Sequence, residues 1–268
     1  MDNPLAWRPA AINSGSWLTG YSLVALLERV AEGQIVLPIC SLGTSCEELA
    51  ALGPLVLPPL YHEALDESLK PELLERIHTC FPFYAGTQRA GSVGFEVVEL
   101  PVVAHRPPVR KPPVLGFSVD TAVEEHGPHL PLGTDVLQSY AVLERLSDEC
   151  DDLAIAPPVD YGQLTWGLPF GLSIDITAPL LTRYVTGYAN AVLEWITPGA
   201  MYVVDVHGSI VHRRAIEAGL EASEVNRWSF RWLHDSLAKA VELGAQRILP
   251  VQTEFTNSER IRRDRLQA

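Results

Sequence analysis

The segment at residues 124–135, Glu-Glu-His-Gly-Pro-His-Leu-Pro-Leu-Gly-Thr-Asp, constrains the fold of this chain more than any other feature. Gly127, Pro128 and Pro131 interrupt its candidate ligands, so a helix cannot carry the whole segment. Glu124 and His126 lie two residues apart, which places both side chains on one face of an extended backbone. Asp135 returns beyond the proline-bent loop. A strand end and its following loop can surround a metal ion in this way, and the segment offers these ligand candidates: Glu124, His126, His129 and Asp135.

Apolar, β-branched runs alternate with stretches of helical periodicity along the whole chain. We expect helices at residues 23–31, 45–52, 68–79, 135–147, 178–195, 209–220 and 224–243, and strands at residues 35–39, 55–59, 95–103, 114–119, 154–156, 200–206 and 247–251. This alternation predicts an α/β fold with a layered, largely parallel sheet flanked by helices. Such sheets bind ligands at the carboxyl ends of their strands, and Glu124 and His207 both follow a predicted strand.

Composition narrows the functional class. The chain is 47% hydrophobic and 20% charged, which is typical of a soluble globular protein, and it has no apolar run of about 18 residues or export signal. A formal net charge of −13 argues against a nucleic-acid partner. No C-x-x-C or zinc-finger spacing occurs, so we expect reduced thiols in a cytoplasmic protein at each cysteine: Cys40, Cys46, Cys80 and Cys150.

A linker is predicted at residues 106–113, which hold four prolines and three basic residues. It divides the chain into an N-terminal α/β extension at residues 1–110 and a metal-binding domain at residues 111–268. The extension is either a decayed duplicate of that domain or part of the same domain.

The pattern Glu-x-His-Gly-x-His-Leu-Pro-Leu-x-Thr-Asp resembles the metal-binding motif of the creatininase (creatinine amidohydrolase) family. The resemblance covers about residues 112–220 and implies a creatininase-like fold. It also implies two divalent ions, of zinc, manganese or iron. Glu124 and His207 would bind one ion and His126 the other, with Asp135 bridging both. We predict catalytic roles for His129, either as a group that supports the metal ligands or as a proton shuttle, and for Glu125.

The chain departs from the family pattern at several positions. In the family a strand ends in Asn-Gly-His, whereas this chain has Asp205, Val206 and His207. Ser209 stands where creatininase itself has a metal-binding glutamate, and Gln163 replaces a histidine after Tyr-Gly. An alternative role for His207 is that of a helix cap. The acids and histidines left as weaker candidates are Glu254, His212 and Glu217, and we expect the last two to be solvated.

The resemblance implies a metal-dependent amidohydrolase that cleaves a C–N bond of a small cyclic amide or formamide with a metal-bound hydroxide. Two alternatives stay open. One is a peptidase that trims a peptide precursor in a maturation pathway. The other is a non-catalytic scaffold or partner subunit that retains a structural metal. Relatives in the family assemble as hexamers, so the resemblance also implies a homo-oligomer, with neither nucleic acid nor membrane as a partner.

Overall fold

The structure is a computed structural model that describes residues 28–30, 32–42, 56–84, 95–102, 111–127 and 130–232. The helix predicted at residues 45–52, the strand predicted at residues 247–251 and Glu254 lie outside the described residues. So do most of the helix predicted at residues 23–31 and most of the linker at residues 106–113.

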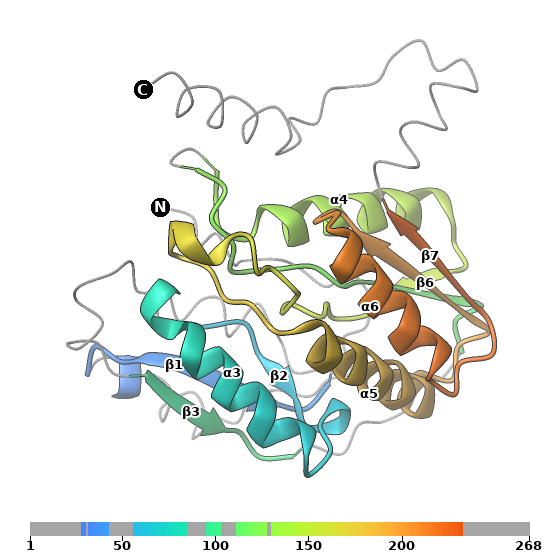
Figure 1. Ribbon diagram of the computed structural model, residues 1–268. Coiled ribbons are helices and arrows are strands. Elements are labelled where there is room, and N and C mark those ends of the chain that lie inside the picture. The colour runs from blue at the N-terminus through green and yellow to red at the C-terminus, as the bar shows by residue number, and fades with distance from the viewer. Residues whose placement is uncertain are drawn as a thin grey trace, which may run out of the picture.

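A four-stranded parallel sheet carries the metal-binding motif (Figure 1). Its spatial order is β5-β4-β6-β7, and its strands are β4 (Val114–Ser118), β5 (Leu153–Ile155), β6 (Ala200–Asp205) and β7 (Trp228–Trp232). In the central pair Val114 lies beside Ala200 and Ser118 beside Val204. β4 and β6 therefore end at the same level, and the loops after them begin side by side.

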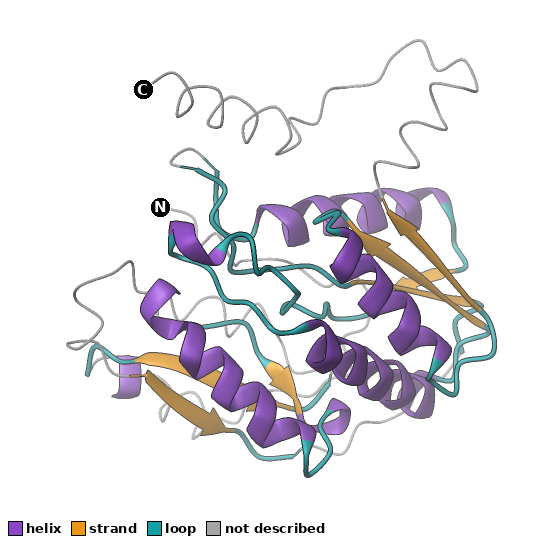
Figure 2. Ribbon diagram, viewed as in Figure 1, coloured by secondary structure: helices purple, strands orange, loops and turns teal. Residues whose placement is uncertain are grey.

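Helices cover both faces of this sheet (Figure 2). On β4, Leu115 and Phe117 join the main core, whereas Gly116 faces the other way, where a Cβ would lie 2.9 Å from Leu143 Cδ2. Leu143 belongs to α4 (Thr134–Glu149), which also contacts β5 and β6. The main core on the opposite face includes side chains from both remaining helices, α5 (Ala178–Ile196) and α6 (Ile210–Glu221).

The helix expected at residues 224–243 is wrong at its start, because Trp228–Trp232 forms strand β7. Met201 pairs with Trp228 and Asp205 with Trp232, so β7 extends the sheet beyond β6. Trp-Ser-Phe-Arg-Trp alternates large aromatic and polar side chains, the period of a strand, and aromatic residues favour strands. Pairing with the edge of β6 therefore favours a strand at these residues over the predicted helix.

A second parallel sheet has the order β2-β1-β3, with β1 at Ile35–Cys40, β2 at Leu60–Tyr61 and β3 at Phe95–Glu99. The strand expected at residues 55–59 is reduced to one bridge, between Val56 and Val36, before β2. The strand expected at residues 95–103 ends at Glu99. One turn of 3-10 helix, η1 (His62–Ala64), and the longer α3 (Leu69–Tyr84) follow β2.

Helix α5 packs against elements of both halves of the chain. The Tyr184 hydroxyl accepts a hydrogen bond from Tyr61 N at 3.4 Å, and Gly187 lies so close to η1 that a Cβ would be 2.3 Å from Ala64 O. One continuous core contains residues of both sheets. The predicted boundary at residue 110 stays a prediction.

The cysteines and the length of the helices bear on two predictions from composition. Cys40 and Cys80 are buried and Cys150 is exposed, while Cys46 lies outside the described residues. Among the helices that the structure describes, none has the length and apolar character needed to cross a bilayer.

We predict that Gly187→Ala destabilises the protein. Glycine to alanine in a helix interior ordinarily stabilises by about 1 kcal/mol, but overpacking against Ala64 O reverses the sign at a cost of about 1–3 kcal/mol. Thermal melting should show a fall in Tm of about 2–4 °C per kcal/mol. Glu194→Ala, on an exposed position of the same helix, is the control. A Tm at or above that of the wild type would contradict the close contact.

Candidate metal centre

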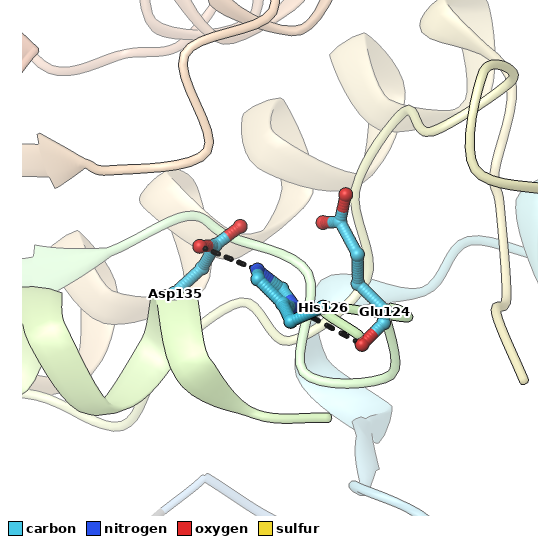
Figure 3. Close-up of side chains that lie close together, drawn as sticks. All are labelled: Glu124, His126 and Asp135. Atoms are coloured by element: carbon cyan, nitrogen blue, oxygen red, sulfur yellow. Dashed lines mark hydrogen bonds and ion pairs between the residues drawn. The ribbon is translucent and has the colours of Figure 1, made fainter. Parts of the chain in front are cut away.

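Three loops at the carboxyl edge of the four-stranded sheet bring the candidate ligands together. Glu124 and His126 follow β4, His207 follows β6, and the loop after β5 contributes Gln163. Asp135 comes from the first turn of α4, where the positive end of the helix dipole favours a carboxylate. Figure 3 shows Glu124, His126 and Asp135 pointing toward one another, and one ligand atom of each lies within 4.8 Å of the other two. The structure therefore brings these three predicted ligands together.

The Asp135 carboxylate lies at the middle of this cluster and is fully buried. Its Oδ1 is 3.2 Å from His126 Nε2, whereas its Oδ2 is 3.3 Å from His207 Nδ1. Each carboxylate oxygen therefore faces a different histidine. This is the arrangement expected of a carboxylate that bridges two ions.

Glu124 completes the His207 side of the cluster. Its Oε2 lies 2.9 Å from His207 Nδ1 and accepts a hydrogen bond from the Thr121 hydroxyl. The same hydroxyl lies 3.3 Å from Asp135 Oδ2. Thr121 therefore orients both carboxylates, a role that sequence reasoning missed because it precedes the recognised motif.

The two histidines are oriented by backbone carbonyls. His126 Nδ1 lies 3.0 Å from Glu124 O, and His207 Nε2 lies 3.0 Å from Gln163 O. A carbonyl oxygen only accepts hydrogen bonds, so each of these ring nitrogens carries the proton. The other ring nitrogen, which faces Asp135 in both cases, is the acceptor in a neutral ring. Metal-binding histidines almost always donate their second N–H in this way.

The electrostatics of the cluster favour a cation. Burial alone would lower the pKa of His207, but Glu124 and Asp135 outweigh it and raise that pKa well above its ordinary value. Burial would likewise raise the pKa of Asp135, but hydrogen bonds and charge from His126 and His207 lower it. The buried carboxylates thus stabilise positive charge at the point where the four side chains meet.

Further buried acids lie behind the metal ligands. Asp120 Oδ1 accepts from Val206 N at 2.8 Å and from His207 N at 3.4 Å, which fixes the backbone under His207. Burial, followed by the charge of Asp135, raises the pKa of Asp120 to about 6. Burial raises the pKa of Asp160 and of Asp205 well above the ordinary value, and Asp120 adds to both shifts. Neither carboxylate oxygen of Asp160 has a hydrogen-bond partner within the described ranges.

The expectation that His212 is solvated is wrong, because its side chain is fully buried. Its Nδ1 accepts from Gln163 N at 3.1 Å, and its Nε2 lies 3.0 Å from Val119 O. Burial, aided by the neighbouring His207, lowers the pKa of His212 to about 3, so the ring is neutral. The ring lies so close to Gly162 that a Cβ there would be 2.5 Å from His212 Cε1. Glu217, by contrast, is exposed as expected.

Ser209 is the N-cap of α6, so the capping role considered for His207 belongs to its neighbour. The Ser209 hydroxyl donates to Gln163 Oε1 at 3.1 Å. Gln163, which replaces the family's histidine, thereby contacts His207, Ser209 and His212 at once. It supports the ligands rather than adding a titratable group.

Of the two predicted catalytic residues, the structure describes only Glu125. His129 lies outside the described residues. Glu125 is half-buried, its Oε1 accepts from Gly127 N at 2.8 Å, and its own N–H donates to Ser173 Oγ at 3.0 Å. Both catalytic roles stay predictions.

Comparisons with known proteins agree with this site. The family model described as creatininase, creatinine amidohydrolase, matches residues 121–257, just over half of the chain. The mycofactocin precursor peptide peptidase of Mycolicibacterium smegmatis is 31% identical over 104 residues, 37% of this chain and 41% of that relative. The match thus spans less than half of the relative's length.

Solved creatininases are more distant. The crystal structure of a creatinine amidohydrolase is 21% identical, covers 51% of this chain and 57% of its own, and gives a TM-score of 0.40. The manganese form of creatininase is 19% identical, covers 51% and 58%, and gives a TM-score of 0.41. These structural similarities are weak, and membership of the family stands on the sequence match.

We predict that Asp135→Ala removes metal from the protein, because both proposed ions lose a ligand. Replacing a residue that only orients a ligand costs about 10–100-fold in metal affinity, so losing the bridging ligand should exceed about 100-fold. Elemental analysis of protein purified without chelator measures this directly. Asp148→Ala, at an exposed acid of the same helix, should keep the wild-type content. Equal metal in both variants would overturn the assignment of Asp135.

Proposed function

We propose that this chain, which belongs to the creatininase family, is a metal-dependent hydrolase that cleaves an amide C–N bond, either in a small cyclic amide or formamide or in a peptide precursor. The observation that carries the proposal is the buried Asp135 carboxylate, whose two oxygens face two different histidines. Two ligand sets that share one carboxylate are typical of dinuclear hydrolases.

The residues present fit two divalent ions. Glu124 and His207 would hold one ion, His126 the other, and Asp135 would bridge them. Carboxylate oxygens and neutral imidazole nitrogens suit zinc, manganese or iron alike. The fit rests on this chain's own geometry, since in each histidine the ring nitrogen left over from the carbonyl contact, the one that would bind a metal ion, faces the shared carboxylate.

The chain's side chains define what the site would do. When bound, the ions would polarise an amide carbonyl and acidify bound water. Thr121 orients Glu124, and the Gln163 carbonyl orients His207. Asp135 is fully buried at the centre of the cluster, so it is kept out of bulk solvent. We assign proton transfer to His129 and Glu125, whose side chains follow the ligands Glu124 and His126 on the same loop.

Two substrate classes follow from this chemistry. One is a small cyclic amide or formamide. The other is a peptide precursor that the enzyme trims, and the curated relative is named a peptidase of this kind. The match covers only 41% of that relative's length, so its name does not decide the substrate of this chain. The surface near the site offers a further criterion.

Exposed apolar side chains lie close in sequence to residues that support the metal centre, and they would suit a peptide substrate. Gln163 contacts Thr165 on one side and Ser209 on the other, and the residues just beyond them are exposed: Trp166 by 83% and Ile210 by 63%. We call the following exposed side chains the apolar rim: Trp166, Phe170, Leu172, Ile210 and Val211. A peptide bound at the metal centre could bury apolar side chains against this rim.

Three further proposals concern the location of the protein, its assembly and its metal. We propose a cytoplasmic homo-oligomer, a hexamer like others in the family, with zinc or manganese as the working metal. A non-catalytic scaffold with one structural ion is the competing proposal. Hydrolysis that disappears with a chelator and returns with added metal would exclude the scaffold.

We predict that chelator treatment abolishes hydrolysis of an amide panel and that zinc or manganese restores it. The panel should hold cyclic amides, formamides and short peptides, with product release followed by mass spectrometry. Asp135→Ala should stay inactive after metal is restored. Metal-independent turnover, or no turnover of any amide by metal-replete protein, would contradict the proposal.

We predict that Trp166→Ala lowers kcat/KM for peptides with an apolar residue beside the cleaved bond by about tenfold. That factor corresponds to about 1.4 kcal/mol, a fraction of the free energy of burying a large aromatic side chain. Turnover of a formamide should be unchanged, and Val102→Ala, at another exposed apolar residue, is the control. Equal loss on both substrates would argue against a peptide-binding role for the rim.

A further inference from the structure

The N-terminal half of the chain lies outside the family match, which begins at residue 121. Its described part nevertheless contacts the loop that follows β5. Helix α3 packs against η2 (Leu168–Phe170), a short 3-10 helix within that loop. The contact that matters for the metal centre joins Arg76 of α3 to Asp175 at the end of the loop.

Arg76 binds both the backbone and the side chain of Asp175. Its Nε donates to Asp175 O at 3.0 Å, and its Nη2 pairs with the Asp175 carboxylate at Oδ2. Cys80, one turn further along α3, also donates to Asp175 O, at 3.2 Å. The Asp175 side chain is 1% exposed, so the guanidinium is the charge that balances a buried carboxylate.

The other oxygen of the Asp175 carboxylate binds the backbone of the loop after β5, beside Gln163. Asp175 Oδ1 accepts a hydrogen bond from Leu164 N. That N–H belongs to the peptide unit between Gln163 and Leu164, whose carbonyl is Gln163 O. The carbonyl faces His207 Nε2 at 3.0 Å. A peptide unit is planar, so fixing its N–H also fixes the direction of its carbonyl.

This geometry links α3 to a metal ligand. Arg76 orients Asp175, Asp175 orients the peptide of Gln163, and that peptide fixes the tautomer and tilt of His207. Hydrogen bonding at the N–H also polarises the peptide, which makes its carbonyl a stronger acceptor for His207. Support of this kind raises the basicity of a histidine ligand at its other nitrogen.

We propose that Arg76 and Asp175 are positioning residues of the metal centre, through which the N-terminal half of the chain sets the affinity of His207 for a divalent ion. The inference rests on the proposed metal site but not on any substrate. It gives residues 69–84 a role in function that the family match does not cover.

The test is titration of metal-free protein with Co²⁺, followed by visible absorption. Arg76→Gln should bind Co²⁺ about 10- to 100-fold more weakly than the wild type, with an altered absorption spectrum because His207 no longer ligates in its fixed orientation. Arg76→Lys keeps the charge but loses the forked contact, and should lie between the two. A purely structural role would not change the spectrum of folded protein.

Arg183→Gln is the matched control. Arg183 also bridges the two halves of the chain, since its Nη1 lies 2.8 Å from Glu72 Oε1 and its Nη2 donates to Ser68 Oγ at 2.6 Å. Within the described residues, its polar partners are Ser68, Asp66 and Glu72, and none of these belongs to the loop after β5. Its Co²⁺ affinity and spectrum should match those of the wild type.

Asp175→Asn carries the test if Arg76→Gln does not fold, because it leaves no buried carboxylate without a counter-ion, and the Arg76 side chain that loses its partner is 27% exposed. It should reproduce the weaker binding and the changed spectrum. Folded variants with wild-type affinity and spectrum would overturn the inference and leave the proposed function standing. Wild-type protein that binds no Co²⁺ would instead overturn the proposed metal site itself, and this inference with it.

Discussion

The parallel pairing of β4 with β6 is the contact on which the metal centre depends. Ser118 lies beside Val204, so the two strands end together and their loops start within reach of each other. Glu124 and His126 come from one loop and His207 from the other, so the proposed pair of ion sites needs both loops. Asp135 then enters from the start of α4, on the face of the sheet that Gly116 leaves open for close packing.

The second constraint is charge. Buried carboxyl groups gather around two histidines, and burial raises the pKa of those without a compensating contact, Asp160 among them. Asp135 escapes this rise only because His126 and His207 surround it. Desolvated carboxylates are costly unless a cation or a hydrogen-bond network offsets them. A divalent ion bound between these carboxylates would offset the free-energy cost of their desolvation, so the cluster is suited to binding a cation.

Sequence reasoning predicted the α/β class, most of the helices and the set of ligand candidates, because these depend on periodicity and on a motif that is local in the chain. It missed contacts made through the backbone, such as Gln163 O on His207, since a carbonyl leaves no mark in the residue type. It placed His212 in solvent because the packing of α6 was unknown. The link from Arg76 to Asp175 spans 99 residues, a separation at which no pattern in a single sequence predicts pairing.

The central claim is that Asp135 is shared between two ions. X-ray diffraction from crystals of metal-replete protein, recorded at the absorption edge of the bound metal, tests it most directly. The account predicts two anomalous peaks about 3.5–4 Å apart, one beside His126 and Asp135 Oδ1, the other beside Glu124, His207 and Asp135 Oδ2. A single peak enclosed by all four side chains, or no peak at Asp135, would contradict it.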